Sequence, residues 1–314
     1  MSIEITRRNA LQVVAATGAA IVTNGMTAEA QAAPGKTGYI DAHSHIWTRD
    51  IDRYPLKKGT TLKDLAPPSF TTEELLATAK PEKVDRVVLI AHHTFYGFDN
   101  TYMTDAAKAH PGTFKVVGMI DDAKPHPDVE MKKLLKEHVT GFRITPSVRK
   151  DAHWLDNAGM KLMWKTAAAT GQAMCCLINP ENLSEVDEMC GQFSDTKVVI
   201  DHFSRIGEDG TLGESDLKNL CSLAKHKNTT VKVSAYYALG KKKPPYDDLI
   251  PMIRRLYESF GPERLMWASD SPYQLDGDNT YAASIALIRD RIDFLSKEDR
   301  ECLLRKTAER VYFF

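Results

Sequence analysis

Short apolar segments recur along the chain, separated by segments in which apolar residues follow a helical spacing. The apolar segments are rich in Val, Ile and Met, and most begin about 25 to 35 residues apart, the length of one strand–helix unit. We expect strands over residues 39–47, 84–93, 114–121, 141–147, 173–179, 197–203, 229–237 and 264–272. The pattern predicts helices over residues 71–80, 99–112, 128–138, 156–171, 181–191, 214–227, 246–261 and 296–314.

The ends of several predicted helices carry recognisable signals. Gly171, Gly191 and Gly261 are expected to stop helices, and Ser296 is expected to cap the last one. Several strands are apolar on both faces, as in a parallel sheet covered by helices. The alternation therefore predicts a single-domain (β/α)8 TIM barrel over residues 38–314, with a loop from 49 to 70 over its mouth. A doubly wound open sheet is the alternative, but its Gly-rich phosphate loop is absent from the sequence.

The first residues resemble a targeting signal. Arg7 and Arg8 precede an uncharged and weakly apolar stretch, residues 9–28, which small Ala-x-Ala cleavage sites follow. We interpret residues 1–32 as a twin-arginine export signal, which predicts a periplasmic or secreted protein. A membrane anchor would need about 18 or more strongly apolar residues, so none is expected.

Composition narrows the class of partner. Forty-one basic and forty-two acidic residues give a net charge of −1, whereas nucleic acids and membrane surfaces attract basic proteins. We therefore expect a small-molecule partner. The five cysteines have no disulfide-framework spacing and are interpreted as buried apolar residues.

Polar residues end three of the predicted strands. Because side chains alternate along a strand, His43 and His45 share a face, with Asp41 one step deeper. The sixth strand ends in His202 and the eighth in Asp270. Each alone has an ordinary structural explanation, such as a hydrogen-bonded histidine or a turn cap. Together they predict an enzyme, because a barrel carries its active site at the C-terminal ends of its strands.

Other strand ends provide candidates for substrate binding. Arg143 ends the fourth strand, His93 and Tyr96 follow the second, and Tyr236 lies in the seventh. Arg143 could bind a carboxylate with two parallel hydrogen bonds, which hints at an acidic substrate. Further basic residues expected near the mouth are Arg149, Lys150, Arg205 and residues 241–243.

The motifs "DAHSHIW", "VVIDHFSR" and "LMWASDSPY" resemble those of the amidohydrolase superfamily, in its amidohydrolase-related branch. The resemblance runs from Tyr39 to Phe314 and implies hydrolysis, decarboxylation or hydration at the mouth of a barrel. It implies that Asp270 is the general base acting on water. It also implies that His43 and His45 bind a divalent metal or polarise a carbonyl group, with His202 beside them.

The sequence departs from the metal-dependent members of that branch. Their further ligand, from the fourth or fifth strand, is replaced by Arg143 and by Leu177, Ile178 and Asn179. A zinc or manganese ion held by His43, His45 and Asp270 is conceivable, but an adjacent arginine would repel it. We therefore expect either no cofactor or one divalent metal ion.

The lactonase group of this branch has a similar gap, so the sequence predicts a hydrolase of sugar or dicarboxylate lactones or related carboxylic esters. Asp270 is expected to activate water, and His43, His45, His202 and Arg143 to hold the carbonyl oxygen. The pKa of Asp270 should be raised, or the substrate activated, for a carboxylate to act as base. The alternatives are a metal-dependent decarboxylase and a non-catalytic exported binding protein.

Overall fold

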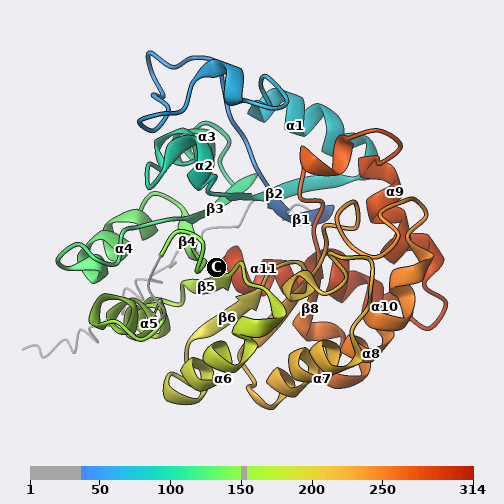
Figure 1. Cartoon of the computed structure of the whole chain (residues 1–314). Helices are drawn as coiled ribbons and strands as arrows, with labels where there is room; N and C mark the ends of the chain where they lie inside the picture. The colour runs from blue at the N-terminus through green and yellow to red at the C-terminus, as the bar shows by residue number, and fades with distance from the viewer. Residues whose placement is uncertain (1–36, 150–153) are drawn as a thin grey trace, which may run out of the picture. The chain divides into compact units, whose positions relative to one another are not determined.

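The computed structural model describes residues 37–149 and 154–314 and confirms the predicted barrel. The described residues form eight parallel strands in sequential order, surrounded by helices (Figure 1). The strands are β1 Tyr39–Ser44, β2 Val84–Ile90, β3 Phe114–Gly118, β4 Val139–Ile144, β5 Ala173–Cys176, β6 Lys197–Ile200, β7 Thr229–Val233 and β8 Leu265–Trp267. The helices are α1 Thr72–Ala79, α2 His93–Tyr96, α3 Thr101–Ala109, α4 Pro127–Leu135, α5 Ala158–Thr170, α6 Leu183–Gln192, α7 Glu214–Ser222, α8 Ile250–Phe260, α9 Tyr281–Ala286, α10 Lys297–Glu301 and α11 Thr307–Tyr312.

The first and last strands meet just beyond their C-terminal ends. Ser44 and Ser271 form a parallel bridge, the amide of His45 donates to the carbonyl of Ser271 (2.8 Å), and the amide of Asp270 donates to the carbonyl of His43 (2.8 Å). The closure of the barrel therefore places the His-x-His segment directly beside Asp270.

Two apolar clusters divide the strand side chains. The larger joins one face of the strands to the surrounding helices. The smaller lines the inside of the barrel with short side chains such as Ala42, Ala173 and Ala268, and with Ala308, Val311 and Tyr312 from the last helix. Figure 1 shows α11 crossing the centre of the ring of strands. The barrel is therefore a packed core, and a ligand can reach only its mouth.

An extra residue in β1 changes which side chains face inward. Asp41 pairs with Val87 and Ser44 pairs with Leu89, so β1 carries one more residue than β2 between the two pairs. Such a bulge re-aims the side chains that follow it. The expectation that Asp41 shares a face with His43 is therefore wrong.

Asp41 instead fastens the end of β8 from outside the pocket. It accepts hydrogen bonds from the amide of Ser269 (2.8 Å) and from the hydroxyl of Tyr281 in α9 (2.9 Å). Burial raises the pKa of Asp41, and these bonds from Ser269 and Tyr281 oppose that effect. We interpret Asp41 as a structural residue.

The remaining predictions have mixed outcomes. Gly171 and Gly261 follow α5 and α8 with positive φ, and Ser296 caps α10, as predicted, but Gly191 lies inside α6. The short helices α2 and α9 were not predicted. The predicted export signal lies outside the described residues. No helix of the described part of the chain is long and apolar enough to span a bilayer. All five cysteines are free thiols.

Candidate active site

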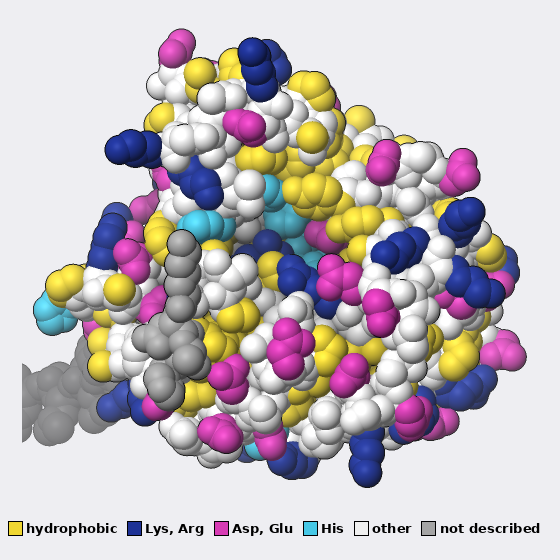
Figure 2. Space-filling view, viewed as in Figure 1, with side chains coloured by type: hydrophobic (Ala, Val, Ile, Leu, Met, Phe, Trp, Pro, Cys, Tyr) yellow, Lys and Arg dark blue, Asp and Glu magenta, His cyan; other side chains and the backbone are white. Residues whose placement is uncertain are grey.

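A cavity of about 250 Å³ opens at the C-terminal ends of the strands. Figure 2 shows it as a hollow with histidine and basic side chains on its floor. The polar residues that line it are His45, His92, Thr94, Arg143, His202, Arg205, Glu208, Tyr237, Asp270 and Tyr273. Three predicted catalytic residues therefore lie in the wall of one pocket.

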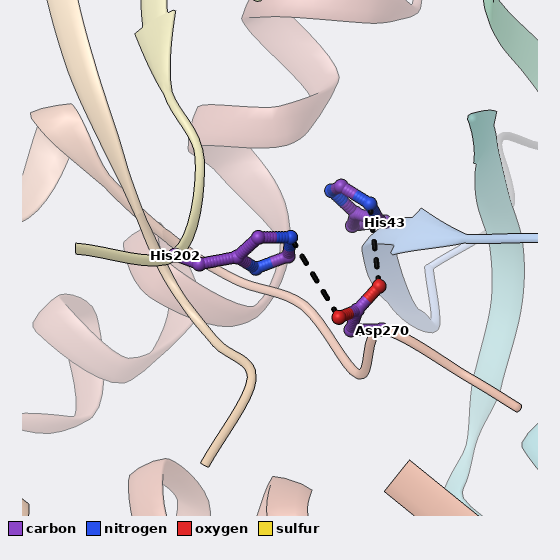
Figure 3. A group of neighbouring side chains, drawn as sticks. All are labelled: His43, His202 and Asp270. Carbon is purple, nitrogen blue, oxygen red and sulfur yellow. Dashed lines mark ion pairs between the residues drawn. The ribbon is translucent and has the colours of Figure 1, made fainter. Parts of the chain in front are cut away.

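Asp270 is the centre of the arrangement (Figure 3). Its Oδ1 lies 3.3 Å from Nε2 of His45 and 3.4 Å from Nε2 of His43. Its Oδ2 lies 3.7 Å from Nε2 of His202 and accepts a hydrogen bond from the hydroxyl of Tyr237 (2.7 Å). Three predicted histidines, from two distant parts of the sequence, thus lie within hydrogen-bond or one-water reach of the Asp270 carboxylate.

The surroundings keep Asp270 ionised. Burial by itself raises the pKa of this carboxyl, but the contacts with His202, His43 and His45 outweigh burial and hold the pKa well below its usual range. The pKa of Asp270 is therefore not raised, contrary to one of the two expectations. As a weak base, Asp270 needs an activated substrate, which was the other expectation.

His45 and His202 are fixed from behind. Nδ1 of His45 donates to the carbonyl of Ile90 (2.9 Å), which leaves Nε2 facing Asp270. Nδ1 of His202 bonds the hydroxyl of Ser234 (2.8 Å) just beyond β7. Burial lowers the pKa of His202 to about 4, so its imidazole is neutral at neutral pH. Both rings can therefore offer a nitrogen to a bound substrate without reorienting.

His43 lies one layer deeper than predicted. Its side chain is 0% exposed and it is not part of the pocket lining. Nη2 of Arg143 lies 2.7 Å from Nε2 of His43, so this nitrogen accepts a hydrogen bond from the guanidinium. Burial and the nearby Lys232 lower the pKa of His43 well below its ordinary value. His43 therefore supports Asp270 from beneath and does not itself face a substrate.

Two charged residues to which the sequence interpretation assigned no role lie beneath His43. Lys232 of β7 and Asp201, which follows β6, are both 0% exposed, and Nζ lies 3.0 Å from Oδ1. Nζ of Lys232 also lies 3.2 Å from Nδ1 of His43, and Oδ2 of Asp201 lies 3.6 Å from Nη2 of Arg143. Their signal in the sequence is a charge at an inward strand position, which is rare without a partner.

The structure changes the predicted set of substrate contacts. Tyr236 is 0% exposed and donates to the carbonyl of Val233, so the contact predicted for it is wrong, and the next residue, Tyr237, lines the pocket instead. His93 and Tyr96 belong to α2 and lie outside the lining.

His92, the residue before His93, occupies the place in the pocket that was predicted for His93. His92 lines the pocket and bonds the hydroxyl of Tyr273, and the hydroxyl of Tyr96 accepts from the amide of Thr48 (3.1 Å). Both pairs, 92–93 and 236–237, lie beyond the ends of their strands, β2 at Ile90 and β7 at Val233, where strand alternation no longer sets the direction of a side chain. Before the second pair, the backbone of Ala235 also has a positive φ of 60°.

Few of the other basic residues contribute to the pocket. Arg149 pairs with Asp122, outside the lining, and residues 241–243 are exposed. Lys150 lies outside the described residues. Arg143 and Arg205 are thus the basic residues that line the cavity in the described part of the chain.

The donor atoms around Asp270 fit a divalent metal poorly. His43, His202 and Asp270 offer one ligand atom each within 4.8 Å, whereas His45, which was predicted as a ligand, is not in this group. The fit is poor because Arg143 occupies the His43 nitrogen that faces Asp270. The charges of Arg143 and Lys232 already balance those of Asp201 and Asp270, so a dication would enter a buried site without spare negative charge.

Comparison with known proteins gives the class of this chain. The family model described as amidohydrolase, of the Amidohydro_2 type, matches residues 40–314. The match covers more than half of the chain, and the chain therefore belongs to this amidohydrolase family. The predicted resemblance is confirmed.

Characterised proteins that are similar to this chain in sequence include lactone hydrolases. The chain is 24% identical over 75% of its length to a 4-sulfomuconolactone hydrolase of Hydrogenophaga intermedia, of which it covers 75%. It is 26% identical over 74% of its length to an L-fucono-1,5-lactonase of Burkholderia ambifaria, of which it covers 80%.

Solved structures share the fold. A probable 2-pyrone-4,6-dicarboxylic acid hydrolase of Acinetobacter baumannii, with citric acid bound, matches 88% of this chain and 100% of its own with TM-score 0.74 and 20% identity. An amidohydrolase of Burkholderia multivorans with bound zinc matches 88% of this chain and 99% of its own with TM-score 0.70 and 19% identity.

Proposed function

We propose that the protein hydrolyses the ring ester of a small lactone, with Asp270 as general base. The observation that carries this proposal is one ionised carboxylate in a pocket, surrounded by His45, His202 and Arg143. The lactone hydrolases among the relatives of the chain support the substrate class. A cavity of about 250 Å³ suits a small ring with one or two substituents.

The mechanism needs one water molecule beside Asp270. The carboxylate takes a proton from this water while its oxygen attacks the acyl carbon and forms a tetrahedral intermediate. His202 and Arg143 stabilise the negative charge that develops on the former carbonyl oxygen. One such pre-positioned donor commonly contributes about 3 kcal/mol of barrier lowering. The ring C–O bond then breaks, and Asp270 returns its proton to the leaving alkoxide oxygen, which yields a hydroxy acid.

The electrostatics favour an ester over an amide. An Asp270 with a lowered pKa is a weak base, so the acyl carbon must be reactive. A strained ring ester with an alkoxide leaving group meets this requirement better than an amide. Tyr237 donates to Oδ2, which fixes the orientation of the carboxylate at the pocket wall.

The proposal needs no metal, because the donor set fits a dication poorly. The second function we keep is a metal-dependent decarboxylase, favoured by the grouping of His43, His202 and Asp270. The third is a non-catalytic binding protein. Export through the predicted signal over residues 1–32 is part of the proposal and would place the activity outside the cytoplasm.

The test is a screen of sugar lactones and carboxylated lactones, followed through acid release, with the native enzyme, Asp270→Asn and the control Asp278→Asn. Asp278 is exposed and lies outside the pocket lining. We expect Asp270→Asn to lower kcat by about 1000-fold or more, in the range of losing an essential base, with the control unchanged.

Metal content, measured on protein purified without chelator, separates the functions. Turnover that persists in chelator with no stoichiometric metal supports the lactonase. One tightly bound metal per chain, with activity lost in chelator, would favour the decarboxylase. Equal activity of Asp270→Asn and native enzyme would exclude Asp270 as base, and ligand binding without turnover of any substrate would favour the binding protein.

A further inference from the structure

Four consecutive residues after β6 have a left-handed backbone. The φ angles of His202, Phe203, Ser204 and Arg205 are 51°, 53°, 55° and 56°. None of them is a glycine, and each L-residue in this conformation costs about 1–2 kcal/mol. We call residues His202–Arg205 the left-handed turn. A run of this length persists only when the surrounding structure holds it in place, and such strain gathers at functional sites.

The left-handed turn sorts its side chains into two directions. Backbone bonds run from the amide of Ser204 to the carbonyl of Asp201 (3.0 Å) and from the amide of Ile206 to the carbonyl of Phe203 (3.3 Å), a three-residue spacing. At three residues per turn, the first and fourth side chains point the same way.

The lining of the cavity reflects this geometry. His202 and Arg205 both line it, whereas Phe203 and Ser204 are 0% exposed and outside it. Phe203 belongs to the cluster between the strands and the helices. The buried pair therefore anchors the turn, and the turn places Arg205 beside a histidine of the catalytic set.

Arg205 carries a charge that has no ion-pair partner among the described residues. Its Nη1 donates to Oδ1 of Asn179 (3.0 Å), a neutral acceptor, and within the described chain it forms no ion pair with a carboxylate. Arg143, by contrast, lies 3.6 Å from Asp201. Glu208 lines the same cavity, yet it lies outside ion-pair distance of Arg205. The guanidinium of Arg205 thus lines the cavity and has N–H groups that are available to a ligand.

We propose that Arg205 binds a carboxylate substituent of the lactone and selects acidic lactones over neutral ones. The selection among lactones as substrates rests on the proposed function. The binding of a carboxylate by Arg205 rests on the pocket alone. A guanidinium can form two parallel hydrogen bonds with a carboxylate, which fixes both position and orientation. Because His202 and Arg205 share one turn, the bound carboxylate sets the distance of the ring ester from His202 and Asp270.

The experiment uses a matched pair of substrates, a carboxymethyl butenolide and its methyl ester. The enzymes are the native protein, Arg205→Gln, Arg205→Lys and the surface control Arg254→Gln, which removes the same charge at an exposed position. We expect Arg205→Gln to lower kcat/KM for the acid by about 10- to 100-fold, mainly through KM, as for a lost charge-assisted hydrogen bond. For the methyl ester we expect less than about a threefold change.

The two other variants separate charge from fold. Arg205→Lys keeps the charge and should recover part of the loss on the acid, and Arg254→Gln should match the native enzyme. Equal losses on the acid and the ester in Arg205→Gln would overturn the inference, because they would indicate a general structural role. A native enzyme that shows no preference for the acid would overturn it as well.

A binding measurement distinguishes this inference from the proposed function. Calorimetry with the same acid and ester reports affinity directly for a ligand that the protein does not hydrolyse, and in the Asp270→Asn background for one that it does. If the native protein hydrolyses neither, but binds the acid and loses about tenfold or more of that affinity in Arg205→Gln, the lactonase proposal fails and the anion site stands. If the acid does not bind, or binds the variant equally well, the anion site is refuted.

Discussion

Replacing Lys232 by methionine tests the charge balance beneath the active site. Lys232 is 0% exposed, its Nζ lies 3.0 Å from Oδ1 of Asp201, and it lies over the ring of Tyr312 at 5.5 Å. Methionine is apolar and has a similar length, so the substitution removes the charge and leaves most of the packing. The buried Asp201 would keep one cation nearby, Arg143 at 3.6 Å.

The magnitude follows from counting charges. The native group holds two cations, Arg143 and Lys232, and two anions, Asp201 and Asp270, while the lowered pKa values of His43 and His202 leave these two rings neutral. Lys232→Met leaves a net charge of −1 and Asp201→Asn leaves +1, both inside the barrel. Removing one partner of a buried pair typically costs about 3–5 kcal/mol. We expect each single variant to lose about this much free energy of unfolding.

The double variant Lys232→Met/Asp201→Asn restores neutrality and should be close to the native protein, because replacing a whole buried pair is often neutral. The sum of the losses of unfolding free energy in the two single variants should then exceed the loss in the double variant by about 3 kcal/mol or more. This difference is the coupling energy expected for groups in contact.

Urea unfolding followed by tryptophan fluorescence and by circular dichroism measures all four proteins. Single variants whose costs simply add in the double variant would show that Lys232 and Asp201 are not coupled, and the charge count would be wrong. A second check lies in pH. Lys232→Met should regain stability relative to the native protein as pH falls, since protonation of Asp201 removes the unpaired charge.

Two further predictions concern the left-handed turn. His202 has a pKa of about 4 because it is buried. Its protonation would place a cation 3.7 Å from Asp270 and weaken this base, so kcat/KM should stay level as pH falls through about 6.5 and decrease only near pH 4. An acid limb near 6.5 in the pH–rate profile would contradict this prediction. Ser204 has a φ of 55° and a buried hydroxyl without a hydrogen-bond partner. The free energy of unfolding of Ser204→Gly should therefore be about 1 kcal/mol higher than that of Ser204→Ala. Urea unfolding of the two variants measures this difference, and an alanine variant as stable as the glycine variant would contradict the strain.

The chain's local pattern was enough to predict its architecture. The apolar segments before Asp270 and His202 have the length and composition of buried strands, and the barrel rule then places both residues at one rim. The same reasoning correctly placed His45 and Arg143 at the mouth. This worked because strand–helix alternation and the position of a strand's end depend on residues close together in the sequence.

The sequence by itself therefore determined the barrel, the amidohydrolase family and the rim that holds Asp270. Only the tertiary structure decided that Tyr237 and not Tyr236 reaches the cavity, and that His43 lies beneath it. It also decided that the left-handed turn brings Arg205 beside His202. The physical reason is that a bulge or a positive φ reverses the direction of a side chain but leaves little trace in the local sequence. Packing against residues distant in the sequence holds the backbone in that conformation. Side-chain alternation along an ideal strand cannot foresee those departures.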